Sequence, residues 1–342
     1  MAKKVTMQDI ADVLNISKNS VSQALSGKPG VSEETRKEVY KVADDLGYRY
    51  TPKTPQPVKE KKATGNIALI ASDFAFSMKS FFGEIYLSIE KEVQKRNKNL
   101  LIQSVSSHAR DHLILPSFIE DKSVDGVLVL SHISNEYINK VIETGIPTVL
   151  IDHHHPSIEA DAILTNNRFG AYTAVQHLIE LGHEEIAYVG DVDFSPSYQE
   201  RLEGYLLALK DYGIEPKKEL IFNNAPEEDQ VINSYISQLA EKPTAWFCVN
   251  DGLGYLVNSG LKLKGIQVPE QASVFSFDDG QLSRLSTPRI TTMAIDLPLF
   301  GKRALDQLFL RIDHPEEPYQ ETLLPAKLIK RESTSHGPKL KD

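Results

Sequence analysis

Two segments decide the fold of the amino-terminal region: Val5–Ala11 (Val-Thr-Met-Gln-Asp-Ile-Ala) and Ser17–Leu25 (Ser-Lys-Asn-Ser-Val-Ser-Gln-Ala-Leu). Thr6 and Asp9 have the spacing of a capping box, and the apolar residues that follow recur on one helical face. Asn15 tolerates the left-handed backbone of a turn, and Ser17 can cap a second helix. The pattern therefore predicts two short helices joined by a tight turn, which is helix-turn-helix geometry.

A third helix completes this region. Ser32, followed by Glu33 and Glu34, predicts its start, and Leu46-Gly47 predicts its end. Three such helices also occur in small bundles that touch no DNA, so the charge is informative. Residues 1–62 contain 12 Lys or Arg and 8 Asp or Glu, a net charge of +4, whereas the whole chain carries −9. A basic end on an acidic body is expected when only that end meets phosphates.

The composition indicates two or three ordinary globular domains, with 342 residues of which 41% are hydrophobic and 25% charged. The one cysteine, Cys248, lies in the apolar run Ala245–Val249, so we expect a buried thiol, no internal disulfide and a reducing compartment. The sequence contains no apolar signal region and no apolar run of about 18 residues. We therefore expect a cytoplasmic protein that does not contact the membrane.

Residues 51–62 contain three prolines and four lysines, which predicts a linker. From Ile67 onward, apolar runs alternate with amphipathic stretches, as in parallel sheets covered by helices. The predicted strands are Ile67–Ile70, Leu100–Ile102, Val127–Leu130, Thr148–Ile151, Ile186–Val189, Ala245–Val249 and Val274–Phe277, and the predicted helices include Phe81–Arg96, Ala171–Leu181, Gln199–Tyr212 and Leu299–Arg311. So many units predict two α/β subdomains, with a ligand cleft at the carboxyl ends of their strands.

Nine motifs, in order along the chain, resemble the lactose/galactose repressor family of bacterial regulators. They are Val-Ser-Glu-Glu-Thr-Arg (31–36), Leu-Gly-Tyr-Arg (46–49), Val-Asp-Gly-Val (124–127), Ile-Pro-Thr-Val-Leu-Ile-Asp (146–152), His-Leu-Ile-Glu-Leu-Gly-His (177–183), Arg-Leu-Glu-Gly-Tyr (201–205), Pro-Thr-Ala-Trp-Phe-Cys-Val-Asn-Asp (243–251), Phe-Asp-Asp (277–279) with Thr-Pro-Arg-Ile-Thr-Thr (287–292), and Leu-Pro-Ala-Lys-Leu-Ile-Lys-Arg-Glu-Ser-Thr (324–334).

The resemblance implies a three-helix helix-turn-helix headpiece (1–50), a hinge (51–62) and a periplasmic-binding-protein-like core (63–334) of two parallel-sheet α/β subdomains, before a polar tail (335–342). Subdomain 1 is expected at about 63–164 and 293–322, and subdomain 2 at about 165–292 and 323–334. The resemblance also implies a homodimer on double-stranded operator DNA, which we expect to act as a repressor. A small-molecule effector, a sugar, a sugar phosphate or a purine, would bind in the interdomain cleft and change operator affinity.

The resemblance places base-reading residues on the second helix at Lys18, Asn19 and Gln23. Gln favours adenine, and many family members have Arg at that position, so we expect a half-site that differs there. The hydroxyl groups of Thr6, Ser20, Ser22 and Ser26 would contact DNA phosphates. The alternative is that these hydroxyl groups only face solvent.

The hinge departs from the family pattern. Family members commonly form a short helix whose leucine enters the minor groove, but Pro52, Pro55 and Pro57 disfavour a helix here. The hinge has two alternative roles. In one, lysines including Lys53 contact DNA phosphates and Val58 is a weak candidate for the minor-groove wedge. In the other, the hinge is a tether with no role in DNA binding.

In the cleft, the resemblance and the strand ends point to six effector-binding residues: Phe74, Asp152, Ser197, Arg201, Asn250 and Asp278. Carboxylates and a guanidinium suit paired hydroxyls or an anionic ligand. The aspartates could instead be structural, and Phe74, Phe81 and Phe82 could be core residues rather than a stacking face.

The sequence carries no motif for an enzyme, a cofactor or a metal. His153-His154-His155 is interpreted as a solvated loop, because three consecutive histidines cannot all face one ion without distortion. Two rival classes remain: a transporter's solute-binding protein, which would lack residues 1–50, and a regulator controlled by a partner protein. The short polar tail favours a dimer over a tetramer.

Overall fold

The computed structural model describes residues 5–26, 30–48, 63–77, 81–131, 133–240 and 242–337, except the side chains of Phe74 and Ser77. The chain divides into two units, residues 1–62 and 63–342, and each is described by itself. The hinge, residues 51–62, with its three prolines and Lys53, lies outside the described residues.

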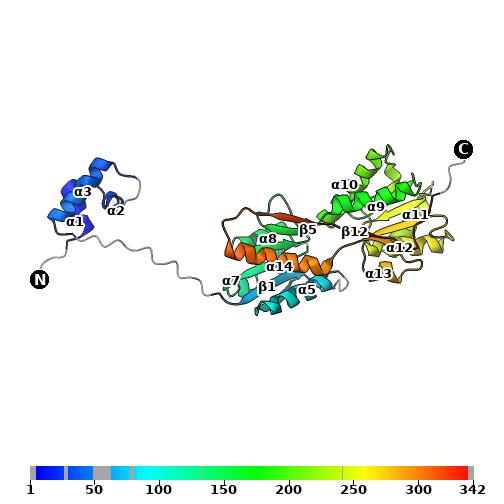
Figure 1. The fold of residues 1–342 in the computed structure, drawn as a ribbon, viewed down its shortest axis with the longest axis horizontal. Coiled ribbons are helices and arrows are strands. Elements are labelled where there is room, and N and C mark those ends of the chain that lie inside the picture. The colour runs from blue at the N-terminus through cyan, green and yellow to red at the C-terminus, as the bar shows by residue number, and fades with distance from the viewer. Residues whose placement is uncertain are drawn as a thin grey trace. The chain divides into compact units, whose positions relative to one another are not determined.

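The first unit holds the three expected helices, α1 (Met7–Leu14), α2 (Lys18–Leu25) and α3 (Glu33–Asp45) (Figure 1). The capping box is present, since the backbone N–H of Thr6 donates to Asp9 Oδ2 at 2.7 Å. Asn15 ends α1 in the left-handed region at φ 51°, and Ser17 caps α2 by accepting from the Ser20 N–H. The apolar sides share one small core, formed by Ile10, Ala11, Val21, Ala24, Leu25, Val39 and Ala43. The predicted helix-turn-helix is confirmed.

The second unit contains two lobes, each built on a six-stranded sheet (Figure 1). The sheet of lobe 1 has the order β11-β5-β4-β3-β1-β2 and is parallel throughout. Its strands are β1 (Asn66–Ser72), β2 (Asn99–Val105), β3 (Gly126–Leu130), β4 (Thr148–Ile151), β5 (Asp161–Thr165) and β11 (Glu321–Leu324). Its helices are α4 (Asp73–Ser77), α5 (Phe82–Lys95), α6 (Ser107–Asp111), α7 (Ser117–Glu120), α8 (Asn135–Ile142) and α14 (Leu297–Asp313).

The sheet of lobe 2 has the order β12-β10-β9-β8-β6-β7, and β12 alone runs antiparallel to its neighbour. Its strands are β6 (Ile186–Val189), β7 (Ile221–Phe222), β8 (Ala245–Cys248), β9 (Ser273–Asp278), β10 (Thr291–Ala294) and β12 (Lys327–Ile329). Its helices are α9 (Asn167–Glu180), α10 (Pro196–Asp211), α11 (Asp229–Gln238), α12 (Asp251–Leu263) and α13 (Gln281–Leu285), with a 3-10 turn at Lys218–Leu220.

The alternation of strands and helices follows from the hydrophobic pattern. Strands β3, β4 and β5 are buried along their whole length, because helices cover both faces of a parallel sheet. Cys248 lies fully buried in β8, and burial raises the pKa of its thiol. None of the described helices is long and apolar enough to cross a membrane.

The chain crosses between the lobes three times, after β5, after β10 and after β11. Each crossing lies slightly later than the expected subdomain limits, because β10 continues in lobe 2 to Ala294 and β11 continues in lobe 1 to Leu324. Backbone pairing sets these limits: the Asn166 N–H donates to the Leu324 carbonyl at 2.8 Å, so two crossings run side by side.

Candidate functional site

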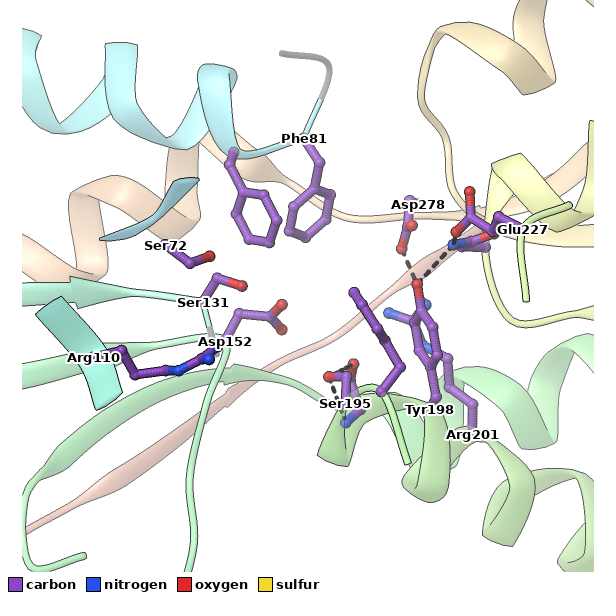
Figure 2. A pocket seen from close by; sticks show the side chains of 14 residues that line it. Ser72, Phe81, Arg110, Ser131, Asp152, Ser195, Tyr198, Arg201, Glu227 and Asp278 are labelled. Atoms are coloured by element: carbon purple, nitrogen blue, oxygen red, sulfur yellow. Dashed lines mark hydrogen bonds and ion pairs between the residues drawn. The ribbon is translucent and has the colours of Figure 1, made fainter. Parts of the chain in front are cut away.

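A cavity of about 200 Å³ opens between the two lobes at the carboxyl ends of their strands. Figure 2 shows Ser72, Phe81, Ser131 and Asp152 on one wall, facing Tyr198, Arg201, Glu227 and Asp278 on the other. The structure brings together five of the six residues singled out from the sequence: Asp152, Ser197, Arg201, Asn250 and Asp278. The sixth, Phe74, belongs to α4, but its side chain lies outside the described part of the structure.

Three cavity residues at strand ends adopt left-handed backbone. Ser131 follows β3 at φ 66°, Asp152 follows β4 at φ 58°, and Asp278 ends β9 at φ 101°. A residue other than glycine costs roughly 1–3 kcal/mol in such a conformation, and this strain gathers at binding sites. Side chains from both lobes are thereby aimed at one point.

Arg201 is the most buried of the residues that line the cavity, only 2% exposed. Its Nε donates to Asn167 Oδ1 at 2.9 Å, and one terminal nitrogen donates to the Val249 carbonyl. The guanidinium also lies 3.8 Å from the centre of the Phe277 ring. Asp278 Oδ1 lies 3.2 Å from a terminal nitrogen, close enough for an ion pair but without a well-aligned hydrogen bond. The arginine is therefore fixed in place before any ligand arrives.

Two carboxylates of the cavity, Asp152 and Asp278, have raised pKa values. Burial raises the pKa of Asp152 to about 6, although Arg201 opposes the shift. Burial also raises the pKa of Asp278 to about 7, against Arg201 and with repulsion from Asp251 and Asp152. Among the described residues, none donates a hydrogen bond to the Asp152 side chain. The Asp152 carboxylate can thus accept hydrogen bonds from a ligand.

Aromatic rings line both walls of the cavity. Phe81 and Phe82 meet edge to face at 4.9 Å, and Phe194 stacks on Tyr198 at 5.7 Å. Phe82 is also part of the lobe 1 core, so core packing and cavity lining are compatible for this residue. Asn250 holds the Tyr198 hydroxyl, because its Nδ2 donates to that oxygen at 2.7 Å.

Seven lining residues were absent from the sequence interpretation: Ser72, Arg110, Ser131, Phe194, Ser195, Tyr198 and Glu227. Ser72 and Ser131 end or follow predicted strands, and Ser195 caps α10 beside Ser197, so the strand-end and cap rules could have found them. Arg110 and Glu227 come from α6 and the loop before α11, where no local pattern marks them.

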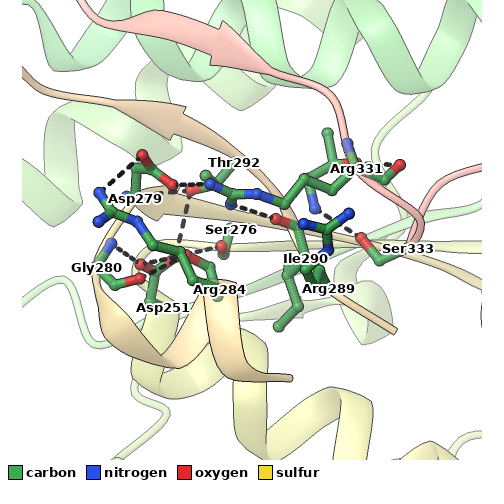
Figure 3. Close-up of polar contacts among 12 residues, drawn as sticks. Asp251, Ser276, Asp279, Gly280, Arg284, Arg289, Ile290, Thr292, Arg331 and Ser333 are labelled. Carbon is green, nitrogen blue, oxygen red and sulfur yellow. Dashed lines mark hydrogen bonds and ion pairs between the residues drawn. The ribbon is translucent and has the colours of Figure 1, made fainter. Parts of the chain in front are cut away.

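A buried polar network fixes the loop that carries Asp278 (Figure 3). Asp251 accepts from the Ser283 hydroxyl at 2.9 Å, the Thr292 hydroxyl at 3.2 Å and the Gly280 N–H. Asp279 pairs with Arg284 at 3.1 Å and with Arg331. The two neighbouring aspartates thus differ, since Asp279 pairs with two arginines outside the cavity whereas Asp278 lines the cavity with Arg201 as its cation.

The histidine loop is not a solvated loop, and this interpretation was wrong for two of its three residues. His153 is 2% exposed, with its Nε2 3.1 Å from Asn135 Oδ1. His154 lies between Glu200 and Glu321, and only His155 is exposed. The loop packs between the lobes, which gives its polar side chains protein partners. No group of three metal-ligating side chains forms within the described ranges.

On the headpiece, Thr6 caps the start of α1, and the other described residues assigned to DNA contact lie on α2 or at its end. Lys18, Asn19 and Ser26 are exposed, and Ser22 and Gln23 are half-buried. Two of the hydroxyl groups already serve helix ends: Thr6 bonds Asp9, and Ser20 lies 2.9 Å from Ser17 Oγ. The Ser26 hydroxyl donates to the Gln23 carbonyl at 3.3 Å. Lys18 and Asn19 therefore present the most accessible polar groups of this helix.

A helix-turn-helix unit followed by a two-lobed α/β core with a cavity of this size defines the class of ligand-responsive DNA-binding regulators. Residues 6–50 match the model "Bacterial regulatory proteins, lacI family", and residues 175–334 match "Periplasmic binding protein-like domain". The chain is 30% identical over 335 residues to the NTD biosynthesis operon regulator NtdR of Bacillus subtilis, covering 96% of this chain and 99% of that protein. It is a member of the lacI family, and thus a transcription regulator rather than an enzyme, as the sequence predicted.

Two further similarities concern proteins whose names include a sugar. The ribose operon repressor of Haemophilus influenzae is 28% identical over 331 residues, covering 96% of this chain and 98% of the relative. A solved lacI-family regulator from Enterococcus faecium with bound ribose is 27% identical, with a TM-score of 0.67, and the match covers 79% of this chain and 99% of that structure.

Proposed function

We propose that this protein is a homodimeric, cytoplasmic repressor whose operator affinity is controlled by a neutral sugar bound between the lobes. The observation that carries the proposal is the cavity, where strained aspartates from both lobes face a buried arginine. A ligand that touches both walls binds one arrangement of the lobes better than others. That difference in affinity is what control of DNA binding requires.

The lining favours a polyhydroxylated ligand of monosaccharide size. A volume of about 200 Å³ is below the roughly 300–1,000 Å³ of pockets for drug-sized ligands. Asp152 and Asp278 can each accept from paired hydroxyls, and the aromatic rings can cover the apolar face of a sugar ring. The ribose named for two relatives supports the same class.

The charge of the cavity disfavours anionic ligands. Three carboxylates line it, Asp152, Glu227 and Asp278. Both guanidinium groups already have protein partners: Arg201 donates hydrogen bonds to protein acceptors, and Arg110 pairs with Asp111 at 2.8 Å. A phosphate or carboxylate on the sugar would meet net repulsion. We therefore expect sugar phosphates and sugar acids to bind more weakly than the parent sugars.

On DNA, we infer that Lys18, Asn19 and Gln23 read bases in the major groove, while Thr6, Ser20, Ser22 and Ser26 contact phosphates. The exposure of Lys18, Asn19 and Ser26 supports the assignment of those three residues, and Lys53 remains a prediction for the hinge. Gln23→Arg should change the preferred base at one position of each half-site, because Arg pairs with guanine where Gln pairs with adenine. Selection from random oligonucleotides measures it, and an unchanged preference would remove Gln23 from the readout.

We infer a homodimer, because two headpieces would have to meet two half-sites related by a two-fold axis. Leu282 and Leu285 on α13 and Tyr255 on α12 are exposed, and such apolar groups in lobe 2 are suited to a subunit interface. Leu285→Glu should shift the sedimentation equilibrium toward monomer and weaken operator binding. A dimer that persists in this variant would place the interface elsewhere.

A thermal-shift screen of the full chain tests the effector proposal with matched ligands: ribose and ribose 5-phosphate, then glucose, glucosamine, glucuronate and glucose 6-phosphate. A ligand at one hundred times its Kd stabilises by about 2.7 kcal/mol. The response should be largest for an uncharged sugar and should vanish in Arg201→Ala. Preference for a phosphate or an acid would contradict the charge argument. No response to any sugar would favour control by a partner protein.

A further inference from the structure

A continuous chain of polar contacts links the cavity to the boundary between the lobes. Arg201 Nε donates to Asn167 Oδ1 at 2.9 Å, and Asn167 Nδ2 donates to Glu200 Oε2 at 2.9 Å. Glu200 Oε1 lies 2.9 Å from His154 Nε2, and His154 Nδ1 lies 3.1 Å from Glu321 Oε1. Every contact in this series joins two side chains, so a single substitution can break it at any one residue.

The middle of this chain spans the two lobes. His154 follows β4 and Glu321 begins β11, both in lobe 1, whereas Glu200 belongs to α10 in lobe 2. Asn167 is the first residue of α9, directly after the crossing from β5. His154 lies two residues after Asp152, and Glu200 immediately precedes Arg201. The contact between the lobes is therefore built next to a ligand-facing residue on each side.

The geometry fixes the charge of His154. Carboxylate oxygens only accept, and each ring nitrogen of His154 faces one. A neutral imidazole has a single N–H, so both contacts require the imidazolium. The pKa of His154 is accordingly raised to about 9, chiefly by Glu200 and then by Glu321, against the effect of burial. Glu200 in turn has a lowered pKa, with Asn167 and Arg168 acting in the same direction as His154.

We propose that His154 is a charged latch between the lobes, which holds α10 and so positions Arg201 for the ligand. It is a positioning residue, since it does not line the cavity. Loss of its proton removes the bond to one carboxylate and leaves Glu200 and Glu321 without the cation that they share. The lobes should then sample a wider range of arrangements. The proposal rests on the proposed function only in treating the cavity as the effector site.

Two variants make a matched pair. His154→Gln keeps a polar side chain of similar length but removes the charge, and His155→Gln makes the same substitution in the same loop at an exposed residue. His155 contacts Ser157 within its own loop, at 2.7 Å, and none of the lobe-bridging carboxylates. A third variant, Glu321→Gln, leaves His154 in place and should lower its pKa.

The titration of His154 comes first. Nuclear magnetic resonance of histidine-labelled full chain, assigned by the signal lost in His154→Gln, should give a pKa near 9 that falls in Glu321→Gln. A value at or below the ordinary 6.5 would overturn the proposal.

The arrangement of the lobes is measured next by electron paramagnetic resonance. Spin labels at Glu136→Cys on α8 and Lys210→Cys on α10 report on the two lobes, because both positions are exposed and the native Cys248 is buried. The protein is diluted with unlabelled chain. The distance distribution should be narrow at pH 7.5 in the parent and in His155→Gln, and broader in His154→Gln.

Raising the pH to 10 should broaden the distribution in the parent but add nothing in His154→Gln. A distribution in His154→Gln that matches the parent at both pH values would refute the latch. Neither readout uses DNA or an effector, so failure here is distinguishable from failure of the proposed function.

Discussion

Replacing Asp278 by asparagine should stabilise the ligand-free protein at neutral pH. The substitution keeps the shape of the side chain, and asparagine tolerates the left-handed backbone found at φ 101°. It removes a charge that burial disfavours and that Asp251 and Asp152 repel, which together outweigh the attraction of Arg201 at 3.2 Å. Asp278 is suited to binding a ligand, and we therefore expect it to lower the free energy of unfolding when no ligand is bound.

The pKa of Asp278 gives the magnitude. It lies at about 7 in the folded protein against an ordinary 3.8, so the folded state binds this proton more tightly than the unfolded state. The free energy of unfolding therefore decreases as pH rises from 3.8 to about 7. The full difference corresponds to about 4 kcal/mol, and relaxation of the surroundings reduces it to roughly 2 kcal/mol. Asparagine does not titrate, so the variant does not lose this part of the free energy of unfolding as the pH rises.

Urea unfolding at pH 4, 5, 6, 7 and 8 is the assay, with Asp279→Asn as the matched control. The gain of Asp278→Asn over the parent should be small at pH 4, grow with pH and level off above pH 7. Asp279→Asn should instead destabilise by about 1–3 kcal/mol, because it weakens charge-assisted bonds to Arg284 and Arg331. If both variants lose stability to the same extent, or if the effect of Asp278→Asn is independent of pH, the reasoning is refuted.

Three further predictions test packing, two of them near the cavity and one in the headpiece. Arg201→Met should destabilise by about 3–5 kcal/mol at pH 8, because it leaves Asp278 buried without its cation, and by less at pH 5, where Asp278 takes up a proton; urea unfolding at the two pH values measures the difference. Gly204→Ala should destabilise by about 1–3 kcal/mol or more, since a Cβ there would lie 2.1 Å from the Arg168 carbonyl where α9 meets α10; an unchanged melting temperature would mean that the helices can separate. Val39→Ala should weaken the headpiece core by about 1–2 kcal/mol and reduce operator binding, while calorimetry should find the melting of residues 63–342 unchanged.

The headpiece could be predicted in detail because its signals are local. Thr6, Asn15, Ser17 and Ser32 act within three residues of their own positions, so the sequence contains the partners as well as the caps. The core was predictable in its alternation, since parallel strands buried on both faces are continuous apolar runs. Five short strands were not predicted: β7, β11 and β12 at sheet edges, and β5 and β10 inside the sheets.

Half of the candidate site was equally accessible from the sequence. Asp152, Asn250 and Asp278 follow or end apolar strands, and residues at the carboxyl ends of parallel strands meet at one edge. Arg110 and Glu227 reach the cavity from α6 and from the loop before α11, and their local sequence resembles any polar surface segment. The histidine loop was misjudged for the same reason, because the partners of His154 are 46 and 167 positions away.

The sequence by itself therefore determined the helix-turn-helix, the α/β class, the family and the strand-end residues, all of which depend on neighbours along the chain. Only the tertiary structure decided which polar groups share a cavity and which one bridges the lobes. Three crossings of the chain bring distant segments together, and a carboxylate such as Asp278 acquires its raised pKa only when burial and Asp251 surround it. Burial and charge proximity are properties of the folded assembly, and no short stretch of residues carries them.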